Sequence, residues 1–288
     1  MKKVIERLLV FLIGIPLIAC LVLLLTHYNN LALNIAAILM SGIGAVEFSS
    51  MLEKKQIRVP KVWSFILGAL APLALTLNIS LGLPDWLVSV IIMSGAGLAL
   101  ISGVFSRSSQ IETVLSRTIG CFSLLVYPGF FMYWLIKMTV WQNPGAILLF
   151  LSICFASDSI AWLFGTLMGA NNRGIIAVSP NKSIAGFIGG IIGSVAVAIL
   201  AALLFPVIFP VDDGYTATSL ILIATIIGFC TGIAAMFGDL AESAIKRSCE
   251  FKDSGNLMLG RGGILDSIDS IVVAAPIFYM MYHLIFII

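Results

Sequence analysis

The sequence predicts an all-α, polytopic integral membrane protein. Hydrophobic residues fill 60% of the 288 positions, charged residues fill only 10%, and the mean hydropathy is +1.11. A soluble protein carries about a quarter charged residues, so this composition is typical of a chain that lies mostly in lipid. The apolar runs are continuous and do not alternate with polar residues, which favours spanning helices over membrane strands.

Nine apolar runs are each long enough, at about 20 residues, to cross a bilayer as a helix. They cover residues 4–26, 29–52, 62–82, 86–106, 118–140, 144–168, 184–209, 218–240 and 265–287. Lys2 and Lys3 ahead of the first run resemble the start of a secretion signal. No small-residue cleavage site follows Cys20, so we expect the first helix to be retained.

The positions of Lys and Arg predict that the N-terminus lies in the cytoplasm. With nine helices in this orientation, only Lys137 of the 16 Lys and Arg residues falls on the outer side. The outer loops instead carry Asp85, Asp212 and Asp213. The net charge of +2 is too small to indicate nucleic-acid binding.

Polar residues divide the chain into N-terminal scaffold helices, 1–140, and a C-terminal catalytic region, 141–288, within one integral membrane domain. In the first part the charges lie in loops, except for Glu47 near the inner end of the second span. Glu47 either extends to the interface or faces a polar cavity. In the second part Asp158 lies inside a span, where a carboxylate needs a partner, water or a metal.

The same span carries small residues at steps of four, Ala161, Gly165 and Gly169, which permit close helix packing or the approach of a ligand. The polar loop that follows contains Ser179, Lys182 and Ser183. Ser183 precedes an apolar run and is expected to cap the next helix. A helix N-terminus with a nearby lysine suits phosphate, although no Walker-type sequence is present.

The charged segment 238–269 lies between two spans and is the main indicator of function. Asp239, Ser243 and Lys246 share one helix face, as does Glu242, and Asp266 and Asp269 share one face of the next helix. Magnesium prefers carboxylates supplemented by water and substrate phosphates, so the three aspartates predict a metal centre for one or two cations. The basic residues of the segment supply charge for pairing with phosphates. They are Lys246, Arg247, Lys252 and Arg261.

Two motifs resemble the phosphatidate cytidylyltransferase family, also called CDP-diacylglycerol synthases. The first runs Ser243-x-x-Lys246-Arg247, Lys252-Asp253, Gly260-x-Gly262-Gly263, Asp266-x-x-Asp269. The second runs Asp158-Ser159-x-Ala161-Trp162, Gly165, Gly169, Ser179-Pro180-x-Lys182-Ser183, Gly186. Together they cover roughly 155–270. The chain departs from the family pattern at Arg261, where His is common, at Ser267, where Arg is common, and at Trp162, where Tyr is common.

The resemblance implies transfer of a cytidylyl group from CTP to phosphatidate in the bilayer, giving CDP-diacylglycerol and pyrophosphate. It implies Mg²⁺, with a second cation left open, and a homodimer in the bacterial cytoplasmic membrane with its active site facing the cytoplasm. The expected metal ligands are Asp239, Asp266 and Asp269, and the expected phosphate-binding catalytic residues are Lys246, Arg247 and Lys252. The remaining substrate-binding residues implied are Asp158, Ser179, Lys182, Ser183, Ser243 and Arg261.

Two alternatives stay open from the sequence. One is another CTP-dependent lipid enzyme, either a kinase that leaves CDP or a cytidylyltransferase for a different lipid. The other is a secondary transporter or cation channel in which Asp158, Asp239 and Asp266 line an ion path. The two halves show no repeat, and a basic phosphate-binding loop has little use in a cation path, so the sequence favours the enzyme.

Overall fold

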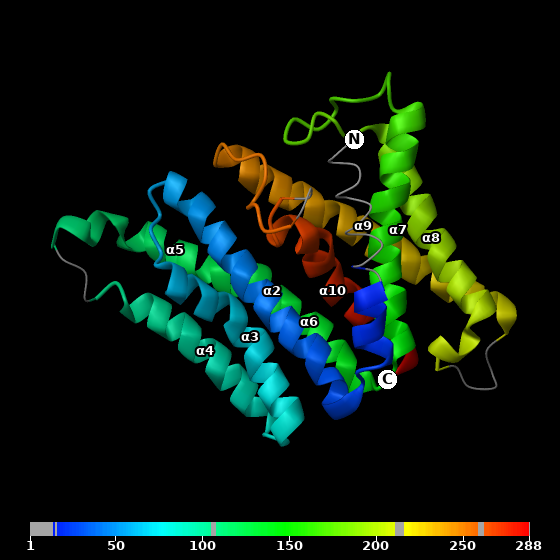
Figure 1. Cartoon of the computed structure of the whole chain (residues 1–288), viewed down its shortest axis with the longest axis horizontal. Helices are drawn as coiled ribbons and strands as arrows, with labels where there is room; N and C mark the ends of the chain where they lie inside the picture. The colour runs from blue at the N-terminus through cyan, green and yellow to red at the C-terminus, as the bar shows by residue number, and fades with distance from the viewer. Residues whose placement is uncertain (1–13, 15, 105–107, 211–215, 259–261, 288) are drawn as a thin grey trace. The chain divides into compact units, whose positions relative to one another are not determined.

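The computed structural model describes residues 14, 16–104, 108–210, 216–258 and 262–287 (Figure 1). Within these residues the chain is helical, without β-strands apart from isolated bridges. The α-helices and the π-helical segment η2 are α2 (His27–Lys54), α3 (Lys61–Leu81), α4 (Asp85–Ile101), α5 (Val114–Leu124), η2 (Leu125–Phe130), α6 (Phe131–Met138), α7 (Pro144–Met168), α8 (Ile184–Leu204), α9 (Ala217–Ser248) and α10 (Leu265–Phe286). The short 3-10 helices are η1 (Ser108–Thr113), η3 (Thr139–Trp141) and η4 (Pro206–Ile208).

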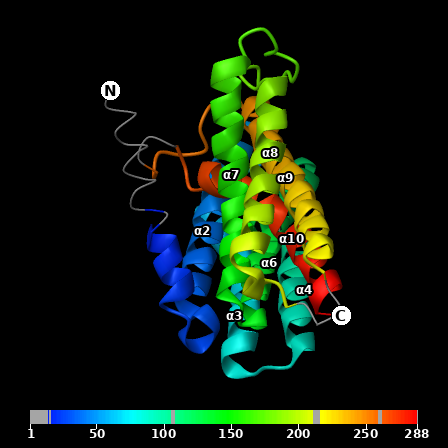
Figure 2. The same ribbon diagram turned by 90° about the vertical axis from the view of Figure 1, so that its right-hand side faces the viewer.

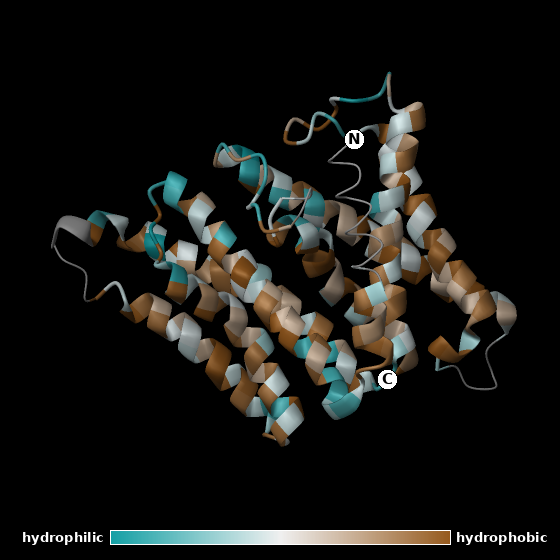
Figure 3. Ribbon diagram, viewed as in Figure 1, coloured by the Kyte–Doolittle hydropathy of each residue, from teal (hydrophilic) through white to brown (hydrophobic). Residues whose placement is uncertain are grey.

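The expected all-α membrane fold is confirmed. Among the described residues, seven helical segments are long and apolar enough to cross a membrane, and α4 is an additional, shorter apolar helix. Hydrophobic residues dominate the helices, whereas hydrophilic ones gather at helix ends and in loops (Figure 3). Eight of the nine expected spans coincide with helical segments, and residues 4–13 and 15 of the first, 4–26, lie outside the described residues. The number of crossings and the side of the N-terminus stay predictions.

The expected span 118–140 is not one continuous α-helix. It consists of α5 and α6 joined by η2, in which Tyr127 has the non-helical angles φ −117° and ψ 111°. Pro128 explains the break, because proline lacks an N–H and disfavours the α conformation of the residue before it.

The chain forms two compact units. The first comprises 1–142 and 246–268, and the second comprises 143–245 and 269–288. Helices α9 and α10 therefore contribute to both units, and the loop between these helices belongs to the first. Whether the scaffold and catalytic regions expected from the sequence are functional divisions stays a prediction.

Small residues bring the helices of the first unit close together. Ser41 of α2 donates a hydrogen bond to the Gly68 carbonyl of α3, with an oxygen–oxygen distance of 2.7 Å. A Cβ on Gly129, in η2, would lie 2.9 Å from that same carbonyl oxygen. Such contacts are typical of membrane helices, which pack through small residues.

In the second unit α7 and α8 lie side by side in both ribbon views (Figures 1 and 2). A Cβ on Gly186 would lie 3.0 Å from the Ala161 carbonyl oxygen, and one on Gly165 would meet the Ser183 hydroxyl at 3.3 Å. The bare face at Ala161, Gly165 and Gly169 therefore packs against α8, as the packing alternative predicted. Asn143 caps α7 by accepting the Ala146 N–H at 3.1 Å.

Candidate functional site

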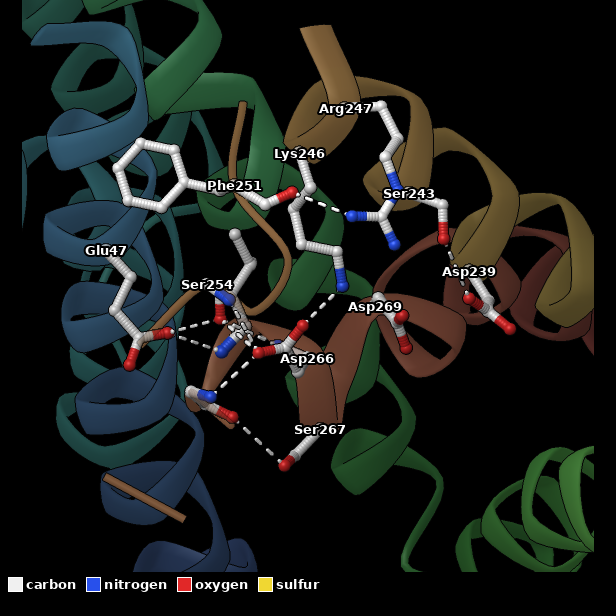
Figure 4. Close-up of polar contacts among 12 residues, drawn as sticks. Glu47, Asp239, Ser243, Lys246, Arg247, Phe251, Ser254, Asp266, Ser267 and Asp269 are labelled. Atoms are coloured by element: carbon white, nitrogen blue, oxygen red, sulfur yellow. Dashed lines mark hydrogen bonds and ion pairs between the residues drawn. The ribbon is translucent and has the colours of Figure 1, made fainter. Parts of the chain in front are cut away.

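The charged segment 238–269 contributes to both units, and its contacts form two sets, one within each unit. The first unit holds Lys246, the loop after α9 and Asp266. The second holds Asp239, Glu242, Ser243 and Asp269. Figure 4 shows the contact of Lys246 with Asp266 in the first unit and that of Ser243 with Asp239 in the second.

In the first unit Asp266 and Lys246 form a buried ion pair. The Lys246 ammonium contacts Asp266 Oδ1, and the two side chains are only 10% and 7% exposed, respectively. The other oxygen, Oδ2, accepts the backbone N–H groups of Ser254 and Gly263, both at 2.7 Å, and the Ser254 hydroxyl at 2.8 Å. Four donors thus fix the Asp266 carboxylate and tie the loop to the start of α10.

Glu47, two turns before the end of α2, contacts the same loop (Figure 4). Its carboxylate is buried and accepts the N–H groups of Ile264, at 3.0 Å, and Leu265, at 2.8 Å. The next N–H, that of Asp266, is accepted by the Ser254 hydroxyl at 3.2 Å. The first turn of α10 therefore has its free N–H groups satisfied by side chains, and negative charge lies at the positive end of the helix.

The sequence allows two positions for the Glu47 side chain, at the membrane interface or in a polar cavity, and Glu47 is not among the predicted site residues. The signal was its isolation as a carboxylate inside an apolar span. Its partners are more than 200 residues away in the chain, so periodicity and spacing gave no means of finding them.

Glycines of the loop make room for these carboxylates. A Cβ on Gly255 or Gly263 would overlap Glu47, and one on Gly262 would overlap Asp266. Gly262 also has φ +108°, a conformation that side chains rarely adopt. The close approach of two carboxylates thus requires glycine at these positions.

The basic residues of the loop have different surroundings. Arg247 is exposed and donates from Nη1 to the Phe251 carbonyl at 3.0 Å, which holds the loop against the end of α9. Lys252 is exposed. Arg261 lies outside the described residues.

In the second unit Asp239 pairs with Lys182. The Lys182 ammonium lies 2.6 Å from Asp239 Oδ2, and the side chains are 25% and 34% exposed, respectively. Ser243, one turn later on α9, donates to Asp239 Oδ1 at 3.4 Å. The ion pair links the loop between α7 and α8 to α9 and brings together three residues that the sequence assigned to the site.

Asp269 is a buried carboxylate of the second unit. Its Oδ1 accepts the Ser270 N–H at 2.6 Å, and Asp239, Glu242 and Asp158 lie close enough to act on it by direct charge repulsion. The Ser270 hydroxyl lies 3.4 Å from Asp158 Oδ1 and 3.2 Å from Asp269 Oδ1. Carboxylates from α7, α9 and α10 therefore share one part of this unit.

Two residues assigned to substrate binding have structural contacts. The Ser183 hydroxyl accepts the Gly186 N–H at 3.0 Å and caps α8, which confirms the cap expected from the sequence. Ser179 lies in the preceding turn, where its carbonyl accepts the Lys182 N–H at 3.0 Å. The turn sets the backbone position of Lys182.

Among the residues that the structure describes, no group of three or more His, Cys, Asp or Glu side chains is arranged to hold a metal ion. The chemistry of the second unit nevertheless fits a cation. The negative charges of Asp158, Asp239 and Glu242 act on the Asp269 carboxylate, and Lys182 forms an ion pair with Asp239. Hard oxygen ligands of this kind suit Mg²⁺.

Comparison with known proteins identifies the family. The model of the cytidylyltransferase family matches residues 5–285. A phosphatidate cytidylyltransferase from Staphylococcus haemolyticus is 31% identical over 242 residues, covering 84% of this chain and 86% of the relative. One from Thermotoga maritima is 31% identical over 206 residues, 70% of each chain, and one from Staphylococcus saprophyticus is 30% identical over 250 residues, 86% and 89% of the two chains. The chain therefore belongs to the cytidylyltransferase family, together with the phosphatidate cytidylyltransferases, and is an enzyme of the nucleotidyltransferase class.

Proposed function

We propose that the protein transfers the cytidylyl group of CTP to phosphatidate, giving CDP-diacylglycerol and pyrophosphate. The observation that carries the proposal is the basic loop after α9, held at the start of α10 by the buried pair of Lys246 and Asp266. Relatives named phosphatidate cytidylyltransferase match this chain over 70–86% of its length. The proposal therefore has support from both the contacts and the family.

The reaction needs charge neutralisation and positioning more than proton transfer. A phosphate oxygen of phosphatidate attacks the α-phosphorus of CTP, and the bond from that phosphorus to the bridging oxygen breaks as pyrophosphate leaves. The attacking phosphate monoester is already ionised near neutral pH, because its second pKa is about 6. A His or Ser base is therefore not required, which agrees with a site rich in Asp, Lys and Arg.

The chain's cations are proposed to bind the phosphates. Arg247 and Lys252 are exposed at the loop and can reach a ligand in water. Lys246 would hold a phosphate by exchanging its contact with Asp266, and Lys182 by exchanging its contact with Asp239. Arg261 is proposed from the sequence alone. Asp158, Ser179, Ser183 and Ser243 complete the proposed substrate-binding set.

The proposed cofactor is Mg²⁺, with a second cation left open. Asp239 and Asp269 lie in the carboxylate group of the second unit and would hold it there, and Glu242 is a further oxygen donor beside them. When bound, the metal would supply positive charge that neutralises the substrate phosphates. In the first unit Asp266 Oδ2 is taken by three donors, so its part in metal binding rests on the sequence and would use Oδ1.

The protein is a membrane protein, and its relatives are bacterial. We propose that it lies in the bacterial cytoplasmic membrane with the basic loop facing the cytoplasm, where CTP is made. The charge asymmetry of the loops supports this orientation. A homodimer is proposed from the family resemblance.

The test is a product assay with purified protein in detergent, phosphatidate and CTP labelled in the cytidine. We expect label in a chloroform-soluble product and one pyrophosphate released for each CTP used. Release of CDP with a phosphorylated lipid would instead identify a kinase. Uptake of phosphatidate or cations by proteoliposomes without CTP consumption would identify a transporter and contradict the proposal.

A further inference from the structure

Within the first unit, Glu47 connects α2 to Ser254 and to the start of α10. Its Oε1 accepts the Ile264 N–H, and its Oε2 accepts both the Leu265 N–H and the Ser254 hydroxyl, at 2.8 and 3.0 Å. The residue is 7% exposed, so it does not extend to the interface. Both oxygens of the carboxylate are therefore used as acceptors inside the protein.

The Ser254 hydroxyl connects Glu47 to Asp266. Its oxygen lies 3.0 Å from Glu47 Oε2 and 2.8 Å from Asp266 Oδ2, and it accepts the Asp266 N–H. A hydroxyl has one proton, so it donates to one carboxylate at a time while the other remains in contact with its oxygen. A displacement of Glu47 would therefore move Ser254 and, with it, the Asp266 carboxylate that pairs with Lys246.

Glycines of the surrounding chain leave the space that the Glu47 carboxylate occupies. Gly255 and Gly263 lie against Glu47 so closely that a Cβ at either position would overlap it. One helical turn earlier on α2, a Cβ on Gly44 would touch Leu265 and Ile268 at 3.4 and 3.5 Å. The α2 face formed by Gly44 and Glu47 thus packs against the loop and the first turn of α10.

We propose that Glu47 is a positioning residue for the transfer reaction: it fixes Ser254 and the start of α10 and, through Ser254, the Asp266 carboxylate that holds Lys246. Glu47 does not touch substrate in this assignment. It acts by restricting Asp266 and Lys246, which are the groups proposed to touch substrate or metal. Glu47 itself lies outside the family motifs, in the N-terminal part of the chain. The inference rests on the proposed cytidylyl transfer.

The decisive variant is Glu47→Gln, which keeps the volume of the side chain. Its amide nitrogen would face an N–H donor in either orientation, because Oε1 and Oε2 each accept a backbone N–H. Glu47→Ala removes both acceptors, and Ser254→Ala removes the connecting hydroxyl. The matched control is Glu53→Gln, the same chemical change at an exposed position near the end of the same helix.

Three quantities are measured for each variant: the folded fraction and melting temperature in detergent, kcat and KM for CTP per folded molecule, and the rate of trypsin cleavage after Lys252. Lys252 is exposed in the loop, so its cleavage reports how firmly the loop is held without any need for turnover. We expect Glu47→Gln to lower kcat per folded molecule by about 10- to 100-fold, the range typical of groups that orient a ligand, with KM changed much less.

Trypsin is expected to cut after Lys252 faster in Glu47→Gln, Glu47→Ala and Ser254→Ala than in Glu53→Gln. The Glu47→Gln and Ser254→Ala effects on kcat should not add in the double variant, because both break one connection. A Glu47→Gln protein that melts earlier but keeps full kcat per folded molecule would overturn the positioning role and leave Glu47 a purely structural residue.

The two proposals fail in different ways. Absence of cytidylyl transfer by the wild-type protein would overturn the proposed function and, with it, the catalytic part of this inference. Unchanged trypsin protection in both Glu47 variants would overturn the anchoring of the loop, whatever the activity.

Discussion

Lys182 and Asp239 form an ion pair with a nitrogen–oxygen distance of 2.6 Å, which links the loop after α7 to α9 within the second unit. The first unit contains a pair of the same kind, Lys246 with Asp266. In both, a carboxylate assigned to metal is held by a lysine assigned to phosphate. We expect substrate binding to exchange these partners, because a cation competes for the carboxylate and a phosphate competes for the lysine.

The Lys182→Met variant tests the first pair. The pair is partly exposed, so its loss should cost stability only about 1 kcal/mol or less. Loss of a charged contact to phosphate should raise the KM for CTP or for phosphatidate by about tenfold or more. Steady-state kinetics with each substrate varied gives the answer, and Lys137→Met, predicted to lie on the outer side, is the control. Unchanged KM values for both substrates would remove Lys182 from the site.

Metal dependence tests the carboxylates of the second unit. We expect EDTA to abolish transfer and added Mg²⁺ to restore it. Asp269→Asn and Asp239→Asn should each raise the Mg²⁺ concentration needed for half-maximal rate, because each removes a charged oxygen ligand. The exposed Glu250→Gln variant should behave as wild type. Full turnover in EDTA would contradict a metal-dependent mechanism.

Asp266→Asn tests the buried pair of the first unit. Its carbonyl oxygen can keep the donors that Oδ2 accepts, but its amide then faces the Lys246 ammonium. We therefore expect a folded protein without turnover whose stability is lower by up to about 3–5 kcal/mol, the range for breaking a buried pair. Thermal melting and the transfer assay measure the two effects.

A double variant, Lys246→Met with Asp266→Asn, separates charge from structure. Removing both charges should recover part of the lost stability, because no unpaired charge remains buried. It should recover no turnover. Normal cytidylyl transfer by a well-folded Asp266→Asn protein would remove Asp266 from the catalytic machinery.

Gly263→Ala tests the close approach of the loop to Glu47. The added methyl group would overlap the Glu47 carboxylate and the Ser254 hydroxyl, so we expect a loss of about 1–3 kcal/mol, as for other overpacked sites. Gly97→Ala in α4 is the control, since a Cβ there meets nothing within 4 Å. A melting temperature unchanged in both variants would show that the loop can move away without cost.

Much of the fold follows from composition and apolar run length. Hydrocarbon cannot hydrogen-bond a backbone, so long apolar runs must be helices, and eight expected spans coincide with helical segments. The cap at Ser183 followed from one residue type at one position. The break at Pro128 was missed because hydropathy alone gave a continuous run, although the proline itself was visible.

The sequence by itself determined the membrane class and the family motifs, and it predicts which charged side chains carry the chemistry, because lipid and phosphate act directly on residue type. The tertiary structure alone decided the partners: Lys182 with Asp239, Lys246 with Asp266, and Glu47 with the start of α10. These contacts join residues from 20 to 218 positions apart. Contacts between distant residues depend on how the helices pack, and helical periodicity does not report packing.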